Sequence, residues 1–258
     1  MTPTKNESTD TRPLLWHAAI EQLIPAIVRI STPNVSGTGV LISKSVTKSL
    51  CAIATAAHVV GDAHYWEQPI RLYHPTSKTT VLLRPGDRAI RVEAGKDEAV
   101  VVFDLIKSKI PFPGNPPKLF EKMHVLKPGV EIGWLGFPAI PKAELCFFSG
   151  KISAYIQTDS KYLVDGVAIH GVSGGPAFRI NDNEVELIGV VTNYYANRST
   201  GETLPGLAAV VDVDEFHKEA EMFKSFDEAK SKESPASAPP PRPMPKASPS
   251  DAAPQIPS

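Results

Sequence analysis

The sequence predicts a mainly β protein: an antiparallel barrel or sandwich, with room for two barrels and with one helix near the end of the chain. Many short runs are apolar or alternating, rich in β-branched residues, and separated by Gly, Pro, Asn, Asp and Ser. These runs do not alternate with helical patterns, which disfavours a parallel α/β sheet. With 258 residues, 42% of them hydrophobic, the chain can bury one large core or two small ones.

The expected elements follow in order along the chain. Apolar residues from Leu14 to Leu23 have helical spacing, and Pro25 ends that helix. The strand-like runs come next, in the order VRI, GTGVLIS, CAIATAA, IRLYH, TTVLL, AIRVE, AVVVFDL, VEIGWLG, KISAYI, YLVDG, AFRI, VELIGVVTN and LAAVV. The segment DVDEFHKEAEMFKSFDEAK then predicts a helix with Asp212 or Asp214 as its N-cap. The apolar stripe of this helix would consist of Phe216, Ala220, Phe223 and Phe226.

The two ends of the chain differ in composition from the globular domain, which we expect to span residues 13–228. Residues 1–12 are predicted to be a flexible N-terminus, without the apolar segment of a secretory signal. Residues 229–258 are predicted to be a disordered, partly polyproline tail, since nine of the 28 residues from Ser231 onward are Pro and none is aromatic. We interpret this tail as a spacer, and the alternative is a docking segment, APPPRPMPK, for a proline-recognising partner.

Composition narrows the classes of partner and compartment. A formal net charge of −1 argues against nucleic acid as a partner, because phosphate binding needs a clustered basic excess. No apolar run approaches the roughly 20 residues that span a bilayer, so no membrane association is expected. Two cysteines do not make a disulfide framework, which favours a cytoplasmic protein.

A serine among glycines, in the segment HGVSGGP from His170 to Pro176, is the first candidate for chemistry. Glycines permit a sharp turn that leaves the hydroxyl of Ser173 open and lets main-chain N–H groups converge on one oxygen. The alternative is an ordinary Gly-rich hairpin turn, and the motif alone does not decide between them. The G-x-S-x-G elbow of α/β-hydrolases is disfavoured, because it needs an acid and then a histidine downstream, and only His217 follows.

A serine nucleophile needs a base with a pKa of about 7, which is usually a histidine. His58, in TAAHVV, follows a strand-like run, so we expect it at a strand end where its side chain can reach a cleft. The alternative is a core histidine bonded to the main chain. We expect structural or surface roles for the remaining candidates, His17, His64, His74, His124 and His217. No CxxC or HExxH occurs, so we predict neither a metal nor any other cofactor.

The base needs a carboxylate that orients it and stabilises its charged form. The candidates between the histidine and the serine are Asp62, Asp87, Asp97, Asp104, Asp159 and Asp165. Asp97 leads into the buried-strand pattern of DEAVVVF, where a carboxylate can be held and shielded from water. Asp104, at the far end of the same run, is the second choice, and Asp87 is expected in an exposed turn.

The motifs TAAHVV, DEAVVV and GVSGGP, in this order, resemble those of the chymotrypsin-like serine peptidases, most closely the HtrA/Deg branch. The segments IQTD at 156–159 and LIGVV at 187–191 also resemble that branch. The resemblance implies two antiparallel six-stranded β-barrels with the active site between them. It implies that His58 is the general base, Asp97 its orienting acid and Ser173 the nucleophile. The oxyanion hole would use the main-chain N–H groups of Gly171 and Ser173.

The same resemblance implies where a polypeptide substrate would bind. The P1 pocket would be formed by Val167, Ala168, Ile169 and His170. The extended substrate backbone would pair with Val191, Thr192 and Asn193. Since no acidic residue lies in this pocket, we expect small or medium apolar P1 residues.

The sequence departs from the HtrA/Deg pattern in three ways. Several additional residues separate Asp159 from Ser173, Val172 replaces an Asn, and no length remains for a PDZ domain. Two alternatives to a serine endopeptidase therefore stay open. One is a catalytically silent pseudo-protease that binds peptides, and the other is a structural β-barrel interaction module held by its Pro-rich tail.

Overall fold

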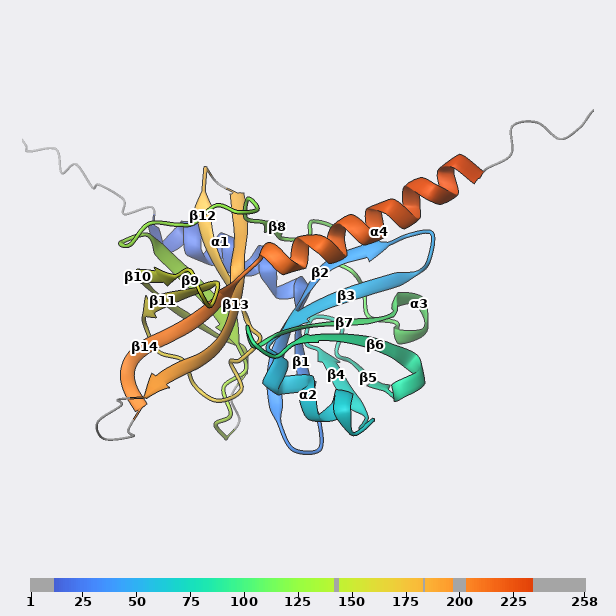
Figure 1. The fold of residues 1–258 in the computed structure, drawn as a ribbon, viewed down its shortest axis with the longest axis horizontal. Helices are drawn as coiled ribbons and strands as arrows, with labels where there is room; N and C mark the ends of the chain where they lie inside the picture. The colour runs from blue at the N-terminus through green and yellow to red at the C-terminus, as the bar shows by residue number, and fades with distance from the viewer. Residues whose placement is uncertain (1–11, 142–143, 183, 197–202, 234–258) are drawn as a thin grey trace, which may run out of the picture.

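Two antiparallel sheets lie next to each other, and a helix from each end of the chain packs outside them (Figure 1). The structure is a computed structural model that describes residues 12–141, 144–182, 184–196 and 203–233. The fold class predicted from the sequence is confirmed, because the described chain is mainly β and ends in a helix.

The first sheet is an open half-barrel of seven strands within the described residues, in the order β5-β4-β1-β2-β3-β7-β6. Its strands are β1 (Ile27–Ser31), β2 (Ser36–Ser45), β3 (Leu50–Thr55), β4 (Ile70–His74), β5 (Thr79–Leu83), β6 (Arg88–Glu93) and β7 (Glu98–Asp104). Its short helices are η1 (Ile24–Ala26), α2 (Ala57–Tyr65), η2 (Pro85–Asp87) and α3 (Leu105–Ser108). The seven strand-like runs of the sequence from VRI to AVVVFDL correspond to these seven strands, whereas the family resemblance implied six. The β4–β5 hairpin extends the sheet beyond β1, and β5 and β6 are not paired with each other in this described sheet.

Strands β3 and β7 are neighbours in the first sheet and run antiparallel, with Thr55 opposite Ala99 and Leu50 opposite Asp104. Both strands come from runs of small and β-branched residues that are buried throughout most of their length. This register places the end of β3 beside the start of β7. The segments that carry His58 and Asp97 therefore leave the sheet at the same edge.

The second sheet closes into a six-stranded barrel, because β12 pairs with both β9 and β13. Its strands are β8 (Lys118–Leu119), β9 (Glu131–Gly136), β10 (Cys146–Ile156), β11 (Lys161–Asp165), β12 (Pro176–Asn181), β13 (Glu184–Ala196) and β14 (Thr203–Asp212). The two-residue strand β8 lies outside the ring and pairs in parallel with β13. Trp134 of β9 and Phe178 of β12 are both buried.

Each terminal helix packs against the more distant sheet in the sequence: α1 precedes the first sheet but contacts the second barrel, and α4 follows the second barrel but contacts the first sheet. Helix α1 (Arg12–Leu23) leads into the first sheet, but its Trp16 ring lies 5.3 Å from Phe147 and 5.6 Å from Phe178 of the second barrel. Helix α4 (Asp214–Glu233) follows the second barrel and crosses over β2 and β3 of the first sheet (Figure 1). The two helices therefore tie the barrels together from both ends of the chain.

Helix α4 follows the predicted pattern. Asp212 accepts a hydrogen bond from the N–H of Asp214 at 3.2 Å, and Phe216 and Phe223 are buried. Near its other end, Asp227 accepts hydrogen bonds from the β2–β3 turn, including the hydroxyl of Ser45. The helix reaches residue 233, beyond the expected domain boundary at 228. The remainder of the predicted tail and residues 1–11 lie outside the described residues.

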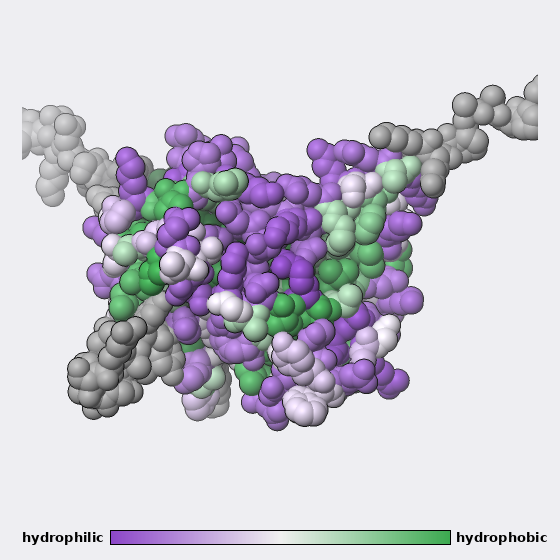
Figure 2. All heavy atoms as spheres, in the orientation of Figure 1, coloured by the Kyte–Doolittle hydropathy of each residue, from purple (hydrophilic) through white to green (hydrophobic). Residues whose placement is uncertain are grey.

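On the face shown in Figure 2, hydrophilic side chains gather over the middle of the molecule, where the first turns of α4 cross in Figure 1. Within the described residues, none of the helices combines the length and the apolarity needed to cross a bilayer. Cys51 and Cys146 are both free thiols.

Candidate active site

His58 lies in the first turn of α2, directly after β3 ends at Thr55. Ala56 has an extended conformation with φ −78° and ψ 144°, and it turns the chain from the strand into the helix. The side chain of His58 is 44% exposed, so the core position that was the alternative for this residue is wrong. The imidazole is therefore accessible at the edge of the first sheet, as the sequence predicted.

Asp97 lies in the β6–β7 turn, and its carboxylate contacts His58 directly. The two carboxylate oxygens are 3.1 and 3.0 Å from Nδ1 of His58, and Oδ1 also accepts the main-chain N–H of His58 at 3.0 Å. The carbonyl of Asp97 accepts the N–H of Ala57 at 3.2 Å. Because Nδ1 faces the carboxylate, Nε2 is the ring nitrogen that is not in contact with Asp97.

Asp104 and Asp87, two of the other carboxylates that the sequence offered, lie elsewhere. Asp104 is at the opposite end of β7, where its side chain caps α3 by accepting the N–H of Lys107 at 2.9 Å. Asp87 lies in the exposed η2 turn. The structure therefore brings the first-choice acid to His58 and leaves the second choice with a local structural role.

Ser173 lies in the turn between β11 and β12, and its side chain is half-buried. Its hydroxyl donates a hydrogen bond to the main-chain carbonyl of Thr192 at 3.1 Å. Among the residues that the structure describes, no hydrogen bond joins Ser173 to His58. The serine is thus fixed on β13 of the second barrel, while the histidine is fixed on the first sheet.

The glycines of the serine turn are needed for its conformation. Gly171 and Gly174 have φ of +90° and +82°, a region that residues with a Cβ rarely adopt. A Cβ on Gly174 would lie 2.1 Å from the carbonyl oxygen of Thr38 and from the hydroxyl of Thr55. The alternative of an ordinary exposed hairpin turn does not fit this close packing against the first sheet.

Thr38 of β2 joins the serine turn to the first sheet, a role that the sequence analysis missed. Its N–H donates to the carbonyl of Ser173 at 2.8 Å, and its hydroxyl donates to the carbonyl of Gly171 at 2.8 Å. The same hydroxyl accepts the N–H of Phe137 at 3.0 Å. No local pattern could have revealed Thr38, because all three partners are main-chain groups about a hundred or more residues away.

The amides of Gly171 and Ser173 are the predicted oxyanion donors. Neither donates a hydrogen bond to another of the described residues. The carbonyl of His170 accepts the N–H of Ala139 at 2.6 Å. Since a trans peptide points its C=O and N–H in opposite directions, this contact turns the N–H of Gly171 away from the 138–140 segment.

Comparison with known proteins shows the family to which this chain belongs. The family model of the trypsin-like peptidase domain matches residues 37–190, more than half of the chain. The chain belongs to the trypsin-like peptidases. The enzyme class is therefore serine endopeptidase, a hydrolase of peptide bonds, and polypeptides are its substrates.

Solved structures of other peptidases share the fold. Deg5 aligns with a TM-score of 0.59 and 18% identity, over 82% of this chain and 95% of its own. The serine endoprotease from Yersinia pestis aligns with a TM-score of 0.58 and 21% identity, over 81% of this chain and 66% of its own. The inactive form of a serine-to-alanine mutant of Rv3671c from M. tuberculosis H37Rv aligns with a TM-score of 0.55 and 18% identity, over 82% of this chain and 93% of its own. No curated protein matches the sequence of this chain.

The predicted P1 segment of the peptidase runs from β11 to the serine turn. Val167 is 51% exposed, and its carbonyl accepts the indole N–H of buried Trp134 at 3.2 Å. Ala168 and Ile169 are half-buried against the core, and His170 is exposed. The segment therefore has an apolar surface held in place by Trp134, a residue that the sequence analysis did not select.

The predicted backbone-pairing residues of the peptidase lie in β13. Val191 is bonded to the serine turn, because its carbonyl accepts the N–H of Gly174 at 2.6 Å and its own N–H donates to Gly175 at 2.9 Å. Thr192 is buried, and Asn193 is exposed. The structure thus brings β13 and the serine turn together.

The other histidines do not approach this site. His74 is buried, with Nε2 at 3.0 Å from the carbonyl of Pro25, and Nε2 of His217 is 2.8 Å from the carbonyl of Phe120. His17 and His124 are exposed near glutamates, and His64 is exposed on α2. The structural and surface roles predicted for all five agree with these positions.

Proposed function

We propose that this peptidase cleaves polypeptides with Ser173 as nucleophile, His58 as general base and Asp97 as the carboxylate that orients the base. The observation that carries the proposal is the contact of Nδ1 of His58 with both oxygens of Asp97, at 3.1 and 3.0 Å. A carboxylate in this position selects the tautomer that carries its proton on Nδ1. Nε2 then has a free lone pair with which to accept a proton.

The proposed first step is acylation. Rotation of the Ser173 side chain releases Thr192 and brings the hydroxyl to Nε2 of His58, which takes its proton. The serine oxygen bonds to the substrate carbonyl carbon, and the resulting imidazolium protonates the amine as the C–N bond breaks. Water then attacks the acyl-enzyme with the same base, and the serine recovers its proton.

The oxyanion of the tetrahedral intermediate would be stabilised by the N–H groups of Gly171 and Ser173. What supports this assignment is that neither amide is bonded to another described residue. The φ of Gly171 and the bonds of the turn to Thr38 fix these amides before substrate arrives. Fixed donors need no reorganisation during the reaction, which is the source of their catalytic value.

The proposed substrate preference is for small or medium apolar P1 residues. The half-exposed Val167 and the partly buried Ala168 and Ile169 support it, because they offer apolar surface and no charge. We propose further that the main chain of β13 at Thr192 and Asn193 pairs with the extended substrate backbone, whereas the N–H and the carbonyl of Val191 are already bonded to the serine turn. A positional P1 peptide library tests the preference, and a strong selection for Arg or Asp would contradict it.

The experiment that tests the catalytic proposal compares cleavage of an unstructured protein by the wild type and by Ser173→Ala. We expect kcat to fall by about 10⁶-fold, or roughly 8 kcal/mol in the activation free energy. Ser225→Ala is the matched control, because Ser225 is exposed on α4 and bonds only locally, to the carbonyl of Met222. Equal cleavage by Ser173→Ala and the wild type would exclude Ser173 as the nucleophile.

One observation favours a second candidate, a catalytically silent protein that binds peptides in the same place. The hydroxyl of Ser173 is bonded to the carbonyl of Thr192 and not to the imidazole of His58. A silent binder would retain peptide affinity in both the wild type and Ser173→Ala, and neither would cleave. The same pair of proteins therefore separates the two functions.

A further inference from the structure

The backbone conformation of Asp97 is intrinsically unfavourable and has to be stabilised by surrounding contacts. Its φ is +60°, in the left-handed region that is unfavourable for a residue with a Cβ. Within the turn, the N–H of Asp97 donates to Ala94 at a long 3.3 Å, and the N–H of Lys96 donates to Glu93 at 3.2 Å. The position of the carboxylate beside His58 therefore depends on the bond from the N–H of Ala57 to the carbonyl of Asp97, and also on contacts made by the chain neighbours of Asp97.

Both chain neighbours of Asp97 extend toward α4. Nζ of Lys96 is 3.2 Å from Oε1 of Glu215 in the first turn of that helix. The side chain of Glu98 is wholly buried on the same side, with Nη1 of Arg91 at 3.5 Å. Neither carboxylate oxygen of Glu98 has a hydrogen bond among the described residues.

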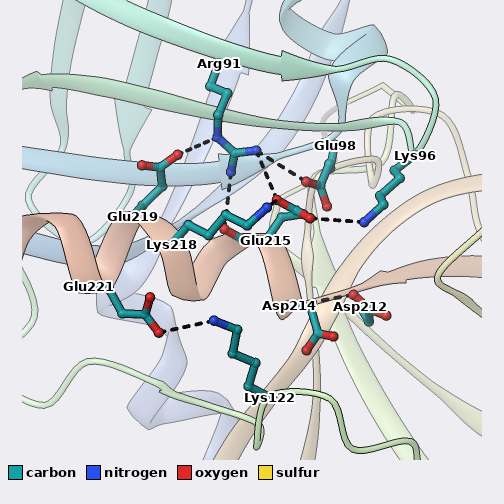
Figure 3. Close-up of polar contacts among 10 residues, drawn as sticks. All are labelled: Arg91, Lys96, Glu98, Lys122, Asp212, Asp214, Glu215, Lys218, Glu219 and Glu221. Atoms are coloured by element: carbon teal, nitrogen blue, oxygen red, sulfur yellow. Dashed lines mark hydrogen bonds and ion pairs between the residues drawn. The ribbon is translucent and has the colours of Figure 1, made fainter.

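Arg91 lies between Glu98 and the glutamates of α4, as Figure 3 shows. Its guanidinium is bonded through Nε to Glu219, and its Nη2 donates to the main-chain carbonyl of Glu215 at 3.4 Å. Its Nη1 also lies 3.9 Å from Oε2 of Glu215. Strand β6 and α4 are thereby joined beside the turn that carries Asp97.

We propose that Glu215 is a positioning residue, which holds the turn carrying Asp97 through Lys96 on one side and through Arg91 and Glu98 on the other. The inference rests on the proposed function, because it assigns to Glu215 the placement of the proposed catalytic acid. Glu215 does not touch His58 or Asp97, so its action is transmitted through the backbone of residues 96–98.

The electrostatics of the contacts agree with this role. The ammonium groups of Lys218 and Lys96 hold the pKa of Glu215 below its ordinary value, so Glu215 is ionised at neutral pH. Partial burial works against the charge of Lys96, yet the pairing with Glu215 raises the pKa of Lys96. Only about a third or less of either side chain is exposed, so solvent screens the pair less than a surface ion pair.

The arrangement also links the two barrels. Helix α4 continues directly from the second barrel, which carries Ser173, and reaches the first sheet at the base of the Asp97 turn. A single helix therefore sets the acid turn relative to the barrel that supplies the nucleophile.

The test uses the full-length protein with Glu215→Gln, which removes the charge and keeps the size. We expect kcat to fall roughly tenfold with KM unchanged, because the loss affects the alignment of the base and not substrate binding. The matched control is Glu221→Gln, six residues further along α4. Its carboxylate pairs with exposed Lys122 at 3.3 Å, away from the Asp97 turn (Figure 3).

A second readout follows the acid–base pair itself, without catalysis. We expect the proton on Nδ1 of His58, held by the carboxylate of Asp97, to give a far-downfield ¹H resonance that is absent in His58→Ala. We expect this resonance to broaden and shift in Glu215→Gln and to be unchanged in Glu221→Gln. Lys96→Met breaks the same contact from the turn side and should reproduce both effects, so the test does not depend on one variant folding.

Wild-type kcat together with an unchanged resonance in Glu215→Gln and Lys96→Met would overturn the inference. It would leave the proposed function intact. Conversely, if Ser173→Ala retained full activity, the proposed function would fail. The resonance would still decide whether Glu215 positions Asp97.

Discussion

In the first sheet, the candidate site is built from side chains: the imidazole of His58 meets the carboxylate of Asp97, which also binds the histidine's own N–H. In the second barrel, it is built from the main chain. The turn around Ser173 is fixed by hydrogen bonds of its backbone and by two glycines with positive φ, and the serine hydroxyl itself rests on a carbonyl.

The difference follows from what each half would have to do. A base that receives a proton needs a fixed partner for its charge, which a side-chain carboxylate supplies. A site for a developing oxyanion needs N–H groups in fixed directions, which a rigid turn supplies. The contacts of the first half are already in place, whereas in the second half the proposed acylation requires the Ser173 hydroxyl to leave the carbonyl of Thr192.

After Ser173→Ala, the next largest effect on kcat should come from the side-chain half. Asp97→Asn is expected to lower kcat about 10⁴-fold, because an amide favours the wrong tautomer of His58. Asp104→Asn is the control, since that carboxylate caps α3 at the other end of β7. Steady-state kinetics on a peptide substrate measure both. Equal losses in the two variants would show that the position next to His58 has no special role.

The main-chain half should be sensitive to a single methyl group. Gly174→Ala is expected to lower the free energy of unfolding by about 4 kcal/mol, because its Cβ would clash with main-chain and hydroxyl oxygens of β2 and β3. Gly86→Ala is the control, because the space around its added Cβ is open. Denaturant unfolding checks the difference, and similar curves for the two variants would contradict the close packing of the serine turn.

Removal of the Thr38 hydroxyl, which links the two halves, should lower the free energy of unfolding slightly less than Gly174→Ala does. Thr38→Val removes a hydroxyl that donates to Gly171 and accepts from Phe137, leaving a buried N–H without its partner. We expect a loss of about 3 kcal/mol in unfolding free energy and a lower kcat. Thr80→Val, at an exposed position of β5, should change neither quantity. A Thr38→Val protein with wild-type kcat would mean that the serine turn is held without β2.

The smallest effect is a pH dependence of the free energy of unfolding that arises from Glu98. The charged groups near its carboxylate are Arg91, Lys96, Glu215 and Asp212. Burial, partly opposed by Arg91, raises the pKa of Glu98 to about 7. The folded state therefore binds this proton more tightly than the unfolded state. The resulting stability is fully present below the ordinary glutamate pKa and is lost as pH rises to about 7.

Glu98→Gln should remove that decline and exceed the wild type in unfolding free energy by roughly 2 kcal/mol at pH 8. Glu93→Gln, at the exposed position opposite Glu98 on β6, should retain the wild-type pH dependence. Unfolding curves between pH 4 and pH 8 provide the measurement. A wild-type stability that does not change over this range would contradict the burial of Glu98.

The strands and the proposed catalytic residues could be predicted because their signals are local. Runs of β-branched residues mark β3 and β7, and His58, Asp97 and Ser173 each lie within a short motif. The apolar stripe of α4 likewise predicted Phe216 and Phe223 as buried. Each of these inferences uses residues that are close together in the chain.

The remaining features depend on contacts between distant segments. Thr38 meets Gly171 across 133 residues, and nothing around Thr38 distinguishes it from other strand threonines. Glu98 follows Asp97 in a charged turn and would be expected to face solvent, but the docking of α4 buries it. The rotamer of Ser173 is likewise set by β13, which no pattern around the serine specifies.

The most direct measurement of whether the two halves form one active site is the mapping of a fluorophosphonate adduct by mass spectrometry. We predict phosphonylation at Ser173, and we predict that His58→Ala abolishes the reaction, because the hydroxyl is activated only by the imidazole. Phosphonylation of a different residue, or equal labelling of Ser173 with and without His58, would contradict this prediction.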